Sequence, residues 1–286
     1  MPGYEAPAKL NLSLLVRPPR DDGYHPLESL VQTVEWCDLL KVERGEEGHD
    51  TFASDIEDNL VERALAELRK TVSVPPLRLS LVKEIPMEAG LGGGSSDAGA
   101  ALLAASDLVG VARDELARVG SRVGADVPLF LIGGTLMMRG TGDEIEPVRP
   151  LEDFAVAVAV PGFGLATEDV YRHWDRLEGP EGAPVPDDRL PPSLRGGMPM
   201  RNDLLPAALE LEPRLGDFMA DVASLWGTAV CLTGSGSACF GYFATLDEAA
   251  DAADTVTDLA RQGRGVELRS HGVARVADRS VNGGRE

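Results

Sequence analysis

Residues 90–96 carry the pattern that points most clearly to chemistry: four glycines in five positions, followed by two serines. Glycine lacks a β-carbon and takes positive φ readily, so other groups can approach such a backbone closely. The segment lies between an alternating pattern at residues 77–81, typical of a strand, and a helical pattern at residues 98–108. Free loop amides and the positive end of a helix dipole would then meet at one point. This arrangement suits an anion, most simply a nucleotide phosphate.

Two familiar phosphate loops do not fit this segment. No lysine follows Gly94, as GxxxxGK[ST] requires, and Ser95 replaces the last glycine of a GxGxxG pattern that begins at Gly90. Ser95, Ser96 and Asp97 stand where a helix N-cap is expected. An ordinary strand-to-helix turn that binds nothing is the alternative, and the glycine content favours phosphate binding over it.

Polar and apolar side chains alternate over residues 7–16, which predicts a strand. Lys9 and Asn11 fall on its polar face and point the same way. Such a lysine is either a solvated charge on a sheet edge or, with the asparagine, part of the wall of a cleft. The spacing alone leaves both interpretations open.

Three further polar residues are candidates because of their context. Asp126 follows a helix predicted at residues 114–123 and precedes a residue that Pro128 biases toward extended geometry, so its carboxylate is not tied to a helix face. A solvated aspartate in a turn is the alternative. Tyr24 and His25 belong to a turn, and they either stack on and hydrogen-bond a base or fasten the turn itself.

The composition is that of an ordinary soluble globular chain, with 286 residues of which 43% are hydrophobic and 26% charged. The net charge of -20 argues against nucleic acid and against an anionic membrane as partners, because both are polyanions. The three cysteines lack CxxC spacing, and no apolar run resembles a signal segment or a membrane span. These features predict a reduced, cytoplasmic setting. The four histidines fit no zinc pattern.

The rest of the pattern predicts sheets that each carry one helical layer. Strands are expected at residues 32–42, 77–81, 154–160, 228–232, 239–243 and 266–276, with a hairpin at 133–146. Helices are expected at residues 59–70, 98–108, 114–123, 167–177, 204–226 and 247–262, the first of them capped by Asp58 or Asn59. Gly110 is expected to end the second helix, and Pro206 and Pro213 to interrupt the fifth. Residues 147–153 are the best candidate for a domain boundary, residues 233–238 form a second glycine and serine loop, and residues 179–199 form a surface loop or lid.

Together these pieces resemble the GHMP small-molecule kinases and, within them, the kinases of diphosphocytidyl methylerythritol in the non-mevalonate isoprenoid pathway. The resemblance runs nearly end to end. Its motifs are Pro7-Ala8-Lys9-Leu10-Asn11-Leu12, Asp22-Gly23-Tyr24-His25, Gly90-Leu91-Gly92-Gly93-Gly94-Ser95-Ser96-Asp97-Ala98, Gly124-Ala125-Asp126-Val127-Pro128, Asn202-Asp203-Leu204 and Thr233-Gly234-Ser235-Gly236-Ser237-Ala238.

The resemblance implies a two-domain α+β fold in which each domain is a mainly antiparallel sheet with helices on one side. Residues 1–150 and 151–286 would form the two domains, with the active site in the cleft between them. It also implies ATP as phosphoryl donor, Mg²⁺, a small-molecule substrate, and a monomer or homodimer. The residues that would hold the ATP phosphates are Pro86, Met87, Glu88, Ala89, Gly90, Leu91, Gly92, Gly93, Gly94, Ser95 and Ser96.

The resemblance also assigns roles in the reaction. Asp126 would take the proton of the substrate's C2 hydroxyl, and Lys9 would lower the pKa of that hydroxyl and stabilise charge on the transferring phosphoryl group. The cytosine of the diphosphocytidyl substrate would be stacked and hydrogen-bonded by Asn11, Tyr24, His25 and Tyr171. The resemblance identifies no metal ligands.

Two residues depart from the family pattern. Glu88 stands where the family usually has glycine, and Gly99 where it usually has alanine. Glu88 is expected to point to solvent or to assist Mg²⁺, because a carboxylate repels phosphates. Another GHMP kinase, acting on homoserine, mevalonate or a sugar, and a non-catalytic nucleotide-binding protein on the same scaffold are the alternatives.

Overall fold

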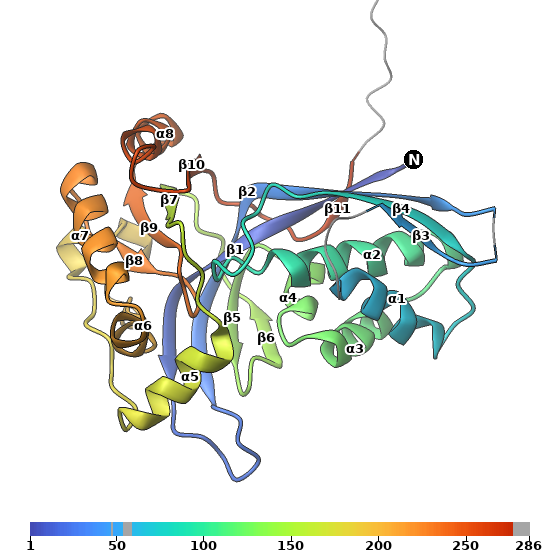
Figure 1. The fold of residues 1–286 in the computed structure, drawn as a ribbon, viewed down its shortest axis with the longest axis horizontal. Coiled ribbons are helices and arrows are strands. Elements are labelled where there is room, and N and C mark those ends of the chain that lie inside the picture. Colours follow the sequence, from blue (N-terminus) through green and yellow to red (C-terminus); the bar gives the residue numbers. More distant parts are fainter. Residues whose placement is uncertain (47, 54–58, 277–286) are drawn as a thin grey trace, which may run out of the picture.

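The computed structural model describes residues 1–46, 48–53 and 59–276, which form two sheets and two groups of helices (Figure 1). The first sheet consists of β1 (Gly3–Val16), β2 (Leu27–Arg44), β3 (Thr51–Ala53), β4 (Leu77–Val82), β5 (Thr135–Arg139), β6 (Glu144–Pro147) and β11 (Ala274–Arg275). The second consists of β7 (Ala155–Val160), β8 (Cys231–Leu232), β9 (Cys239–Phe243) and β10 (Gln262–Val266).

Each sheet has its own helices. The first is covered on one face by α1 (Leu60–Arg69), α2 (Gly93–Val109), α3 (Arg113–Val123) and α4 (Val127–Ile132). The second is covered by α5 (Thr167–Arg176), α6 (Leu205–Leu211), α7 (Arg214–Trp226) and α8 (Leu246–Thr255). Two short 3-10 turns, Asp187–Arg189 and Pro192–Leu194, lie between α5 and α6. No helix of the described residues is both long and apolar enough to cross a membrane.

The strand order confirms the expected α+β class. The first sheet runs β11-β1-β2-β4-β3, with β5 paired to β2 and β6 to β5, and the second runs β10-β7-β9-β8. Every pair is antiparallel except β3 with β4. The two sheets pack against each other, because Leu10 and Leu12 of β1 share a core with Val156 and Val158 of β7.

Strand β1 contributes to three different cores. Tyr4 and Ala6 pack under the first helical layer, Leu10 and Leu12 pack between the sheets, and Leu14 packs with the second helical layer. The β1–β2 register shifts twice, between Pro7 and Ala8 and between Asn11 and Ser13. Such bulges bend a strand and turn its side chains locally. The segment between them carries Lys9 and Asn11 on the face away from Leu10.

Several predicted boundaries are confirmed. Asn59 caps α1 by accepting a hydrogen bond from the amide of Val61, whereas Asp58 lies outside the described residues. Helix α2 ends at Gly110 with φ 77°, the hairpin forms from β5 and β6, and β7 is buried throughout.

Other expectations were wrong in detail. Helix α2 begins at Gly93 with Gly92 as its N-cap, so Ser95, Ser96 and Asp97 lie inside its first turn and do not cap it. The interruption expected at Pro206 does not occur, because this proline lies in the first turn of α6, a position that proline tolerates well. The interruption expected at Pro213 is confirmed, since α6 ends at Leu211 and Pro213 caps α7. The strand expected at residues 266–276 ends instead at Val266, and only Ala274–Arg275 returns to strand geometry, in the first sheet.

Residues 179–199 form a surface loop that is anchored at Leu190 and Leu194, which are buried. The division into domains at residues 1–150 and 151–286 stays a prediction. Segment 267–276 follows the second sheet in sequence but packs on the first, because β11 pairs with β1.

Candidate active site

The glycine-rich loop interlocks with the second glycine and serine loop. Ala238 donates its amide to the carbonyl of Ala89 at 3.1 Å, and a β-carbon on Gly90 would lie 2.3 Å from the carbonyl oxygen of Thr233. Gly92, with φ 73°, has equally little space, because a β-carbon there would lie 2.7 Å from the ring of Phe130. Glycine is therefore required at both positions, and the two loops together form one rigid wall.

Helix α2 starts at the inner end of this wall. The amide of Ser96 is the first to bond back within the helix, to the carbonyl of Gly92 at 3.0 Å. The amides of Gly93, Gly94 and Ser95 therefore have no partner within the helix, as at any helix start. All three residues line the cleft described below. The structure thus holds amides and a helix dipole where an anion could bind.

Lys9 is buried beside this wall. Its side chain is 6% exposed, its Nζ donates to Asn11 Oδ1, and its own amide donates to Leu91 in the glycine loop at 3.0 Å. Of the two interpretations of its spacing, the structure therefore supports the cleft over the solvated edge. Burial lowers the pKa of Lys9, and the negative charge of Asp126 opposes part of this shift.

Asp126 lies at the start of α4, with φ -82° and ψ -10°. The expectation of extended geometry before Pro128 was wrong, because the proline lies in the first turn of the helix, where its missing amide costs nothing. The carboxylate makes no capping hydrogen bond and remains available. Its charge acts on Lys9 and also raises the pKa of Tyr171, in addition to a larger effect of burial. These three groups come from three distant parts of the chain, and all of them line the cleft described below.

Tyr24 and His25 come from the loop between β1 and β2, which reaches α5. Tyr24 is 66% exposed, whereas the His25 side chain is 11% exposed. The His25 ring lies 5.1 Å from the ring of Tyr171 and 5.5 Å from that of Trp174, and its Nε2 lies 2.8 Å from Asp175 Oδ1. His25 thus fastens the loop to α5, while Tyr24 is free to contact a ligand.

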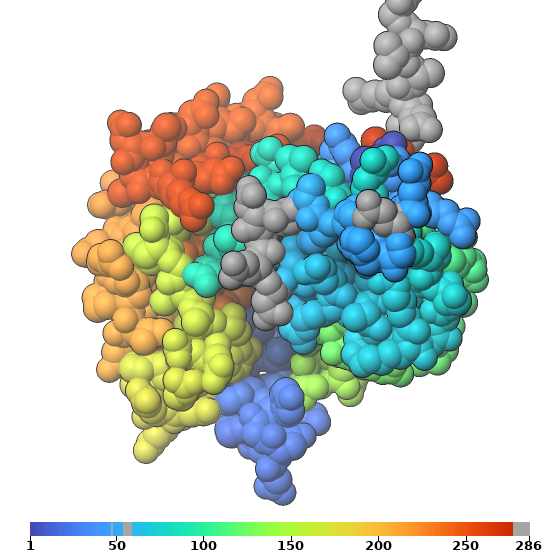
Figure 2. Space-filling model, turned by 45° about the vertical axis from the view of Figure 1, so that its right-hand side comes forward, coloured from blue at the N-terminus to red at the C-terminus, as the bar shows by residue number. Residues whose placement is uncertain are grey.

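These residues surround one cleft of about 910 Å³. Figure 2 shows the surface hollowed between the yellow α5 segment and the blue loop that connects β1 to β2. Lys9, Asn11, Tyr24, His25, Asp126, Tyr171 and each residue from Pro86 to Ser95 line it. Ser96 does not line the cleft, and its buried Oγ has no hydrogen-bond partner among the described residues. None of residues 179–199 lines the cleft either, so this loop is not placed as a lid over it.

The comparisons with known proteins agree with this arrangement. The family described as GHMP kinases N terminal domain matches residues 59–134. The 4-diphosphocytidyl-2-C-methyl-D-erythritol kinase of Granulibacter bethesdensis is 37% identical to this chain over 266 residues, which are 87% of each protein. The enzyme of the same name from Salinispora tropica is 39% identical over 282 residues, which are 90% of this chain and 89% of the Salinispora protein. The chain belongs to the 4-diphosphocytidyl-2-C-methyl-D-erythritol kinase family.

A solved structure of the same family also matches the chain. A crystal structure of 4-(cytidine 5'-diphospho)-2C-methyl-D-erythritol kinase matches with a TM-score of 0.79 and 35% identity, covering 93% of this chain and 98% of that one. A homoserine kinase from Cytophaga hutchinsonii matches with a TM-score of 0.67 but only 16% identity, covering 96% of each chain. The second likeness shows the shared fold and no more.

Sequence reasoning missed a charged cluster behind the glycine loop of this kinase. Lys83 lines the cleft, and its Nζ donates to Asp38 Oδ2 and, at 2.7 Å, to Asp97 Oδ2. Asp38 Oδ1 in turn accepts the amides of Glu84 and Ile85 at 2.6 and 2.8 Å, where the loop begins. Lys83 continues the inward-facing alternation of residues 77–81, so a charge on that face could have drawn attention to it.

The cluster is electrostatically strained. Burial raises the pKa of Asp97 to about 7, Lys83 opposes the rise and Asp38 adds to it. Burial works to lower the pKa of Lys83, but the charges of Asp97 and Asp38 outweigh it and the net direction is upward. The lysine therefore stays charged, and the two carboxylates compete for it.

Proposed function

We propose that the protein transfers the γ-phosphoryl group of ATP to the 2-hydroxyl of 4-diphosphocytidyl-2-C-methyl-D-erythritol, giving the 2-phosphate and ADP. Membership of its family makes it an ATP-dependent small-molecule kinase. The observation that carries the proposal is the convergence of Lys9, Asp126 and the unpaired amides at the start of α2 on one cleft. The reaction would be a step of isoprenoid precursor synthesis in the cytoplasm.

In this proposal the glycine loop, from Pro86 to Ser95, binds the ATP phosphates through its amides and the α2 dipole, whereas Ser96 lies outside the cleft and its amide is bonded within the helix. Asp126 accepts the proton of the attacking hydroxyl, since its carboxylate makes no capping hydrogen bond and, like Lys9, lines the cleft. The Lys9 ammonium lies next to the developing negative charge, and bound phosphates favour its charged form against the effect of burial. Phosphoryl transfer requires mainly positioning and charge stabilisation, and these groups supply both.

The base of the substrate would lie at the other end of the cleft, near the loop that carries Tyr24 and His25. Tyr24 exposes its ring, and Tyr171 presents a second ring from α5. Asn11, whose amide nitrogen is already bonded to Ser29 Oγ at 2.8 Å, adds a fixed polar group to the cleft wall. A planar base stacked on such rings gains contact area without loss of its hydrogen-bonding edge.

Mg²⁺ fits this site as a partner of the phosphates more than of the protein. Among the described residues there is no group of three His, Cys, Asp or Glu side chains that could hold a metal. This ion commonly takes one or two carboxylates and obtains its other ligands from phosphates and water. The ion would neutralise charge on the phosphates.

An assay of ADP release tests the proposal. The full-length protein is incubated with ATP, Mg²⁺ and, in separate reactions, the diphosphocytidyl alcohol, mevalonate or homoserine. We expect turnover with the first alcohol only. Asp126→Ala is expected to lower kcat by at least about a hundredfold while ATP still binds, since general base catalysis contributes on that scale.

The matched control is Asp221→Ala, which removes an exposed carboxylate from α7, away from the cleft. It should leave kcat unchanged. Near-normal turnover of Asp126→Ala would show that the base is assigned wrongly, and turnover with mevalonate or homoserine instead would contradict the proposed substrate.

A further inference from the structure

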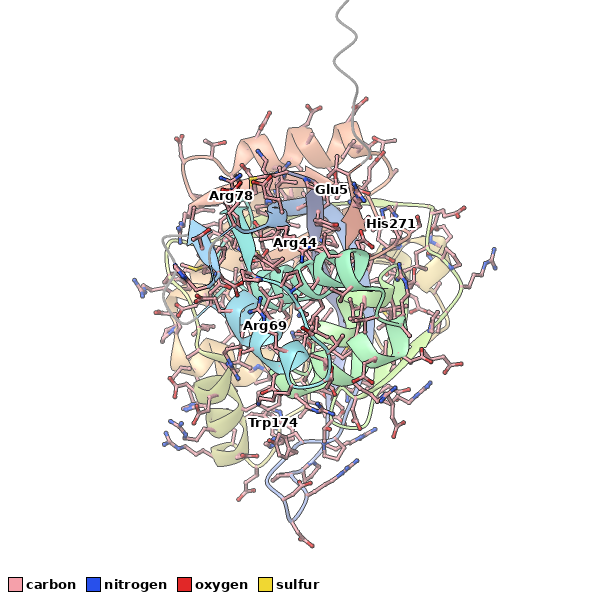
Figure 3. The ribbon with its side chains drawn as sticks, turned by 90° about the vertical axis from the view of Figure 1, so that its right-hand side faces the viewer. Glu5, Arg44, Arg69, Arg78, Trp174 and His271 are labelled. Atoms are coloured by element: carbon pink, nitrogen blue, oxygen red, sulfur yellow. The ribbon has the colours of Figure 1, made fainter. Side chains whose placement is uncertain are left out.

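The edge of β1 that faces away from β2 is covered by loops where the strand carries Lys9 and Asn11. Strand β11 pairs with this edge at Glu5. Figure 3 shows Glu5 near the top of the molecule and Trp174 of α5 near its foot, and β1 runs from the first toward the second. Further along the strand, the amide of Lys9 donates to the glycine loop at 3.0 Å, and the amide of Asn11 donates to Thr233 Oγ1 at 2.9 Å. The two loops that form the wall of the cleft therefore also hold the strand segment that carries the lysine.

Thr233 is itself held from both sides. Its side chain is fully buried, and it does not line the cleft. Asn202 donates its side-chain amide to the carbonyls of Leu232 and Gly234 at 3.0 and 2.8 Å, and these are the residues directly before and after the threonine. The amide oxygen of Asn202 accepts the backbone amide of Leu204 at 2.9 Å. The donors and the acceptor of this asparagine are thus all bonded, and the hydroxyl of Thr233 has a fixed place.

The hydroxyl of Thr233 is connected to the ammonium of Lys9 through Asn11. The carboxamide of Asn11 donates to Ser29 Oγ at 2.8 Å, and its Oδ1 accepts the hydrogen bond of Lys9 Nζ. The second glycine and serine loop also limits the ammonium directly, because a β-carbon on Gly234 would lie 3.2 Å from Lys9 Nζ. The ammonium is therefore confined by the side chain of Asn11 and by the backbone next to Thr233.

We propose that Thr233 is a positioning residue for phosphoryl transfer: its hydroxyl fixes the segment of β1 that carries Lys9 and Asn11, and so sets where the Lys9 ammonium meets the transferring phosphoryl group. The inference rests on the proposed function, since it concerns the same reaction. Thr233 acts through Lys9 and touches no substrate, because it lies behind the wall of the cleft. Such a bond matters for the rate, since displacing a catalytic group by about 1 Å can lower a rate about a hundredfold.

The first test observes the lysine without turnover. The chain has only four lysines, so the ¹³C NMR spectrum of the full-length protein labelled at lysine Cε is simple, and Lys9→Arg identifies the Lys9 signal by its loss. We expect the same Lys9 signal in the unaltered protein and in Thr233→Ser, which keeps the hydroxyl. In Thr233→Val, which keeps the shape but loses the acceptor, we expect a displaced or broadened signal. An unchanged Lys9 signal in Thr233→Val would overturn the proposal.

The matched control is Thr135→Val in β5. Thr135 is also buried, and its Oγ1 also accepts a backbone amide, that of Leu151 at 3.2 Å, but it does not line the cleft. The control should leave the Lys9 signal and kcat unchanged. The same changes in Thr135→Val as in Thr233→Val would overturn the proposal, because they would show a general effect of removing a buried hydroxyl.

The second test separates kcat from KM in the assay of ADP release. Thr233→Val should lower kcat about tenfold or more, because the amide of Asn11 loses its acceptor and the strand segment is free to move. The KM for ATP should not change, since the ATP phosphates are assigned to the glycine loop. Thr233→Ser should restore most of kcat. Thr233→Ala, which removes the hydroxyl without filling its space, should behave like Thr233→Val and replaces it if the valine variant fails to fold.

An unchanged kcat in Thr233→Val would overturn the proposal. A raised KM for ATP at unchanged kcat would overturn it too, because the second glycine and serine loop would then act on the nucleotide and not on Lys9. Absence of ADP release with the diphosphocytidyl alcohol in the unaltered protein would instead contradict the proposed function, while the NMR signal would still show whether Thr233 holds Lys9. The two failures are therefore distinguishable.

Discussion

Lys83 balances two buried carboxylates with a single positive charge, so the cluster behind the glycine loop carries a net negative charge. Asp38 is fully buried, and its carboxylate accepts hydrogen bonds from two backbone amides as well as from the lysine, so its charge is the better compensated of the two. Asp97 has one oxygen, Oδ1, without a hydrogen-bond partner in the described part of the chain. The excess negative charge therefore destabilises the ionised form of Asp97 more than that of Asp38.

Asp97→Asn should consequently stabilise the protein, and more so at high pH. The pKa of Asp97 is raised from 3.8 to about 7, so stability that depends on its proton is complete below the lower value and is lost as the pH rises through the upper one. The gain of the variant should thus grow as the pH rises between these values and then level off at about 4 kcal/mol. Urea unfolding of both proteins across this range measures it. The control Asp251→Asn, exposed on α8, should show a difference independent of pH, and a gain for Asp97→Asn that shrinks with rising pH would refute the assignment.

Glu88 occupies a backbone conformation that suits glycine. Its φ is 55°, and a β-carbon on Gly164 would lie 2.9 Å from that of Glu88, so the two segments are in tight contact. Glu88→Gly should stabilise the protein by about 1 kcal/mol, because a side chain at positive φ is strained. The same variant addresses the open role of the carboxylate. An unchanged KM for ATP and an unchanged Mg²⁺ requirement would rule out a metal-binding function for Glu88, and a lower melting temperature would refute the strain.

The residues that the sequence singled out as candidates share a property: each stands in a local pattern that restricts its surroundings. Lys9 and Asn11 stood on one face of an alternating strand, and the structure brings both to the cleft. Asp38 and Asp175 stood in no such pattern, because their significance comes from partners distant in sequence, Lys83 and His25. A contact between a strand and a later loop, or between an early loop and α5, leaves no periodic trace in the chain.

At the scale of elements, α2 shows what pattern reasoning sees and what it misses. The apolar stripe and the terminal Gly110 predicted its body and its end. Its start was placed too late, because glycines usually break helices and here Gly93 and Gly94 form the first turn. They are tolerated because tertiary packing holds them: a β-carbon on Gly93 would lie 3.1 Å from Ile85 and 3.2 Å from Lys83 Nζ.

Gly99, deeper in α2, is not required by close packing. A β-carbon there would lie 3.5 Å from Phe130 and 3.6 Å from Val273, which are ordinary contacts. Gly99→Ala should therefore raise the free energy of unfolding by about 1 kcal/mol through helix propensity. Gly120→Ala, in α3, is the contrasting variant: its β-carbon would lie 2.9 Å from Val127, so it should bring no gain. Denaturant unfolding measures the free energy of unfolding of both variants. An equal increase in Gly99→Ala and Gly120→Ala would contradict the packing argument.

At the scale of the molecule, the two sheets are joined by contacts outside the cleft as well as by the residues that line it. They share the core that contains Leu10 and Val156, and β11 carries the end of the described chain back to β1. Arg269 holds this returning segment in place, since its side chain is 2% exposed and its guanidinium donates to Glu35 at 2.7 Å and to Glu5 at 2.8 Å. A boundary at residue 150 is visible in the sequence as a polar, proline-containing stretch, but these links between distant segments are not.

Because of the shared core and the pairing of β11 with β1, we expect the protein to unfold as one unit, although the sequence predicts two domains. Trp36 reports on the core between the sheets and Trp226 on the core under the second helical layer. In a variant that keeps only Trp36, and in another that keeps only Trp226, with the other tryptophans changed to Phe, the fluorescence transition in urea should coincide with the loss of far-UV circular dichroism. Comparing the two signals within each variant removes the effect of the substitutions on stability. Fluorescence transitions that precede or follow the loss of secondary structure would show instead that the two halves fold independently and that the shared core contributes little to cohesion.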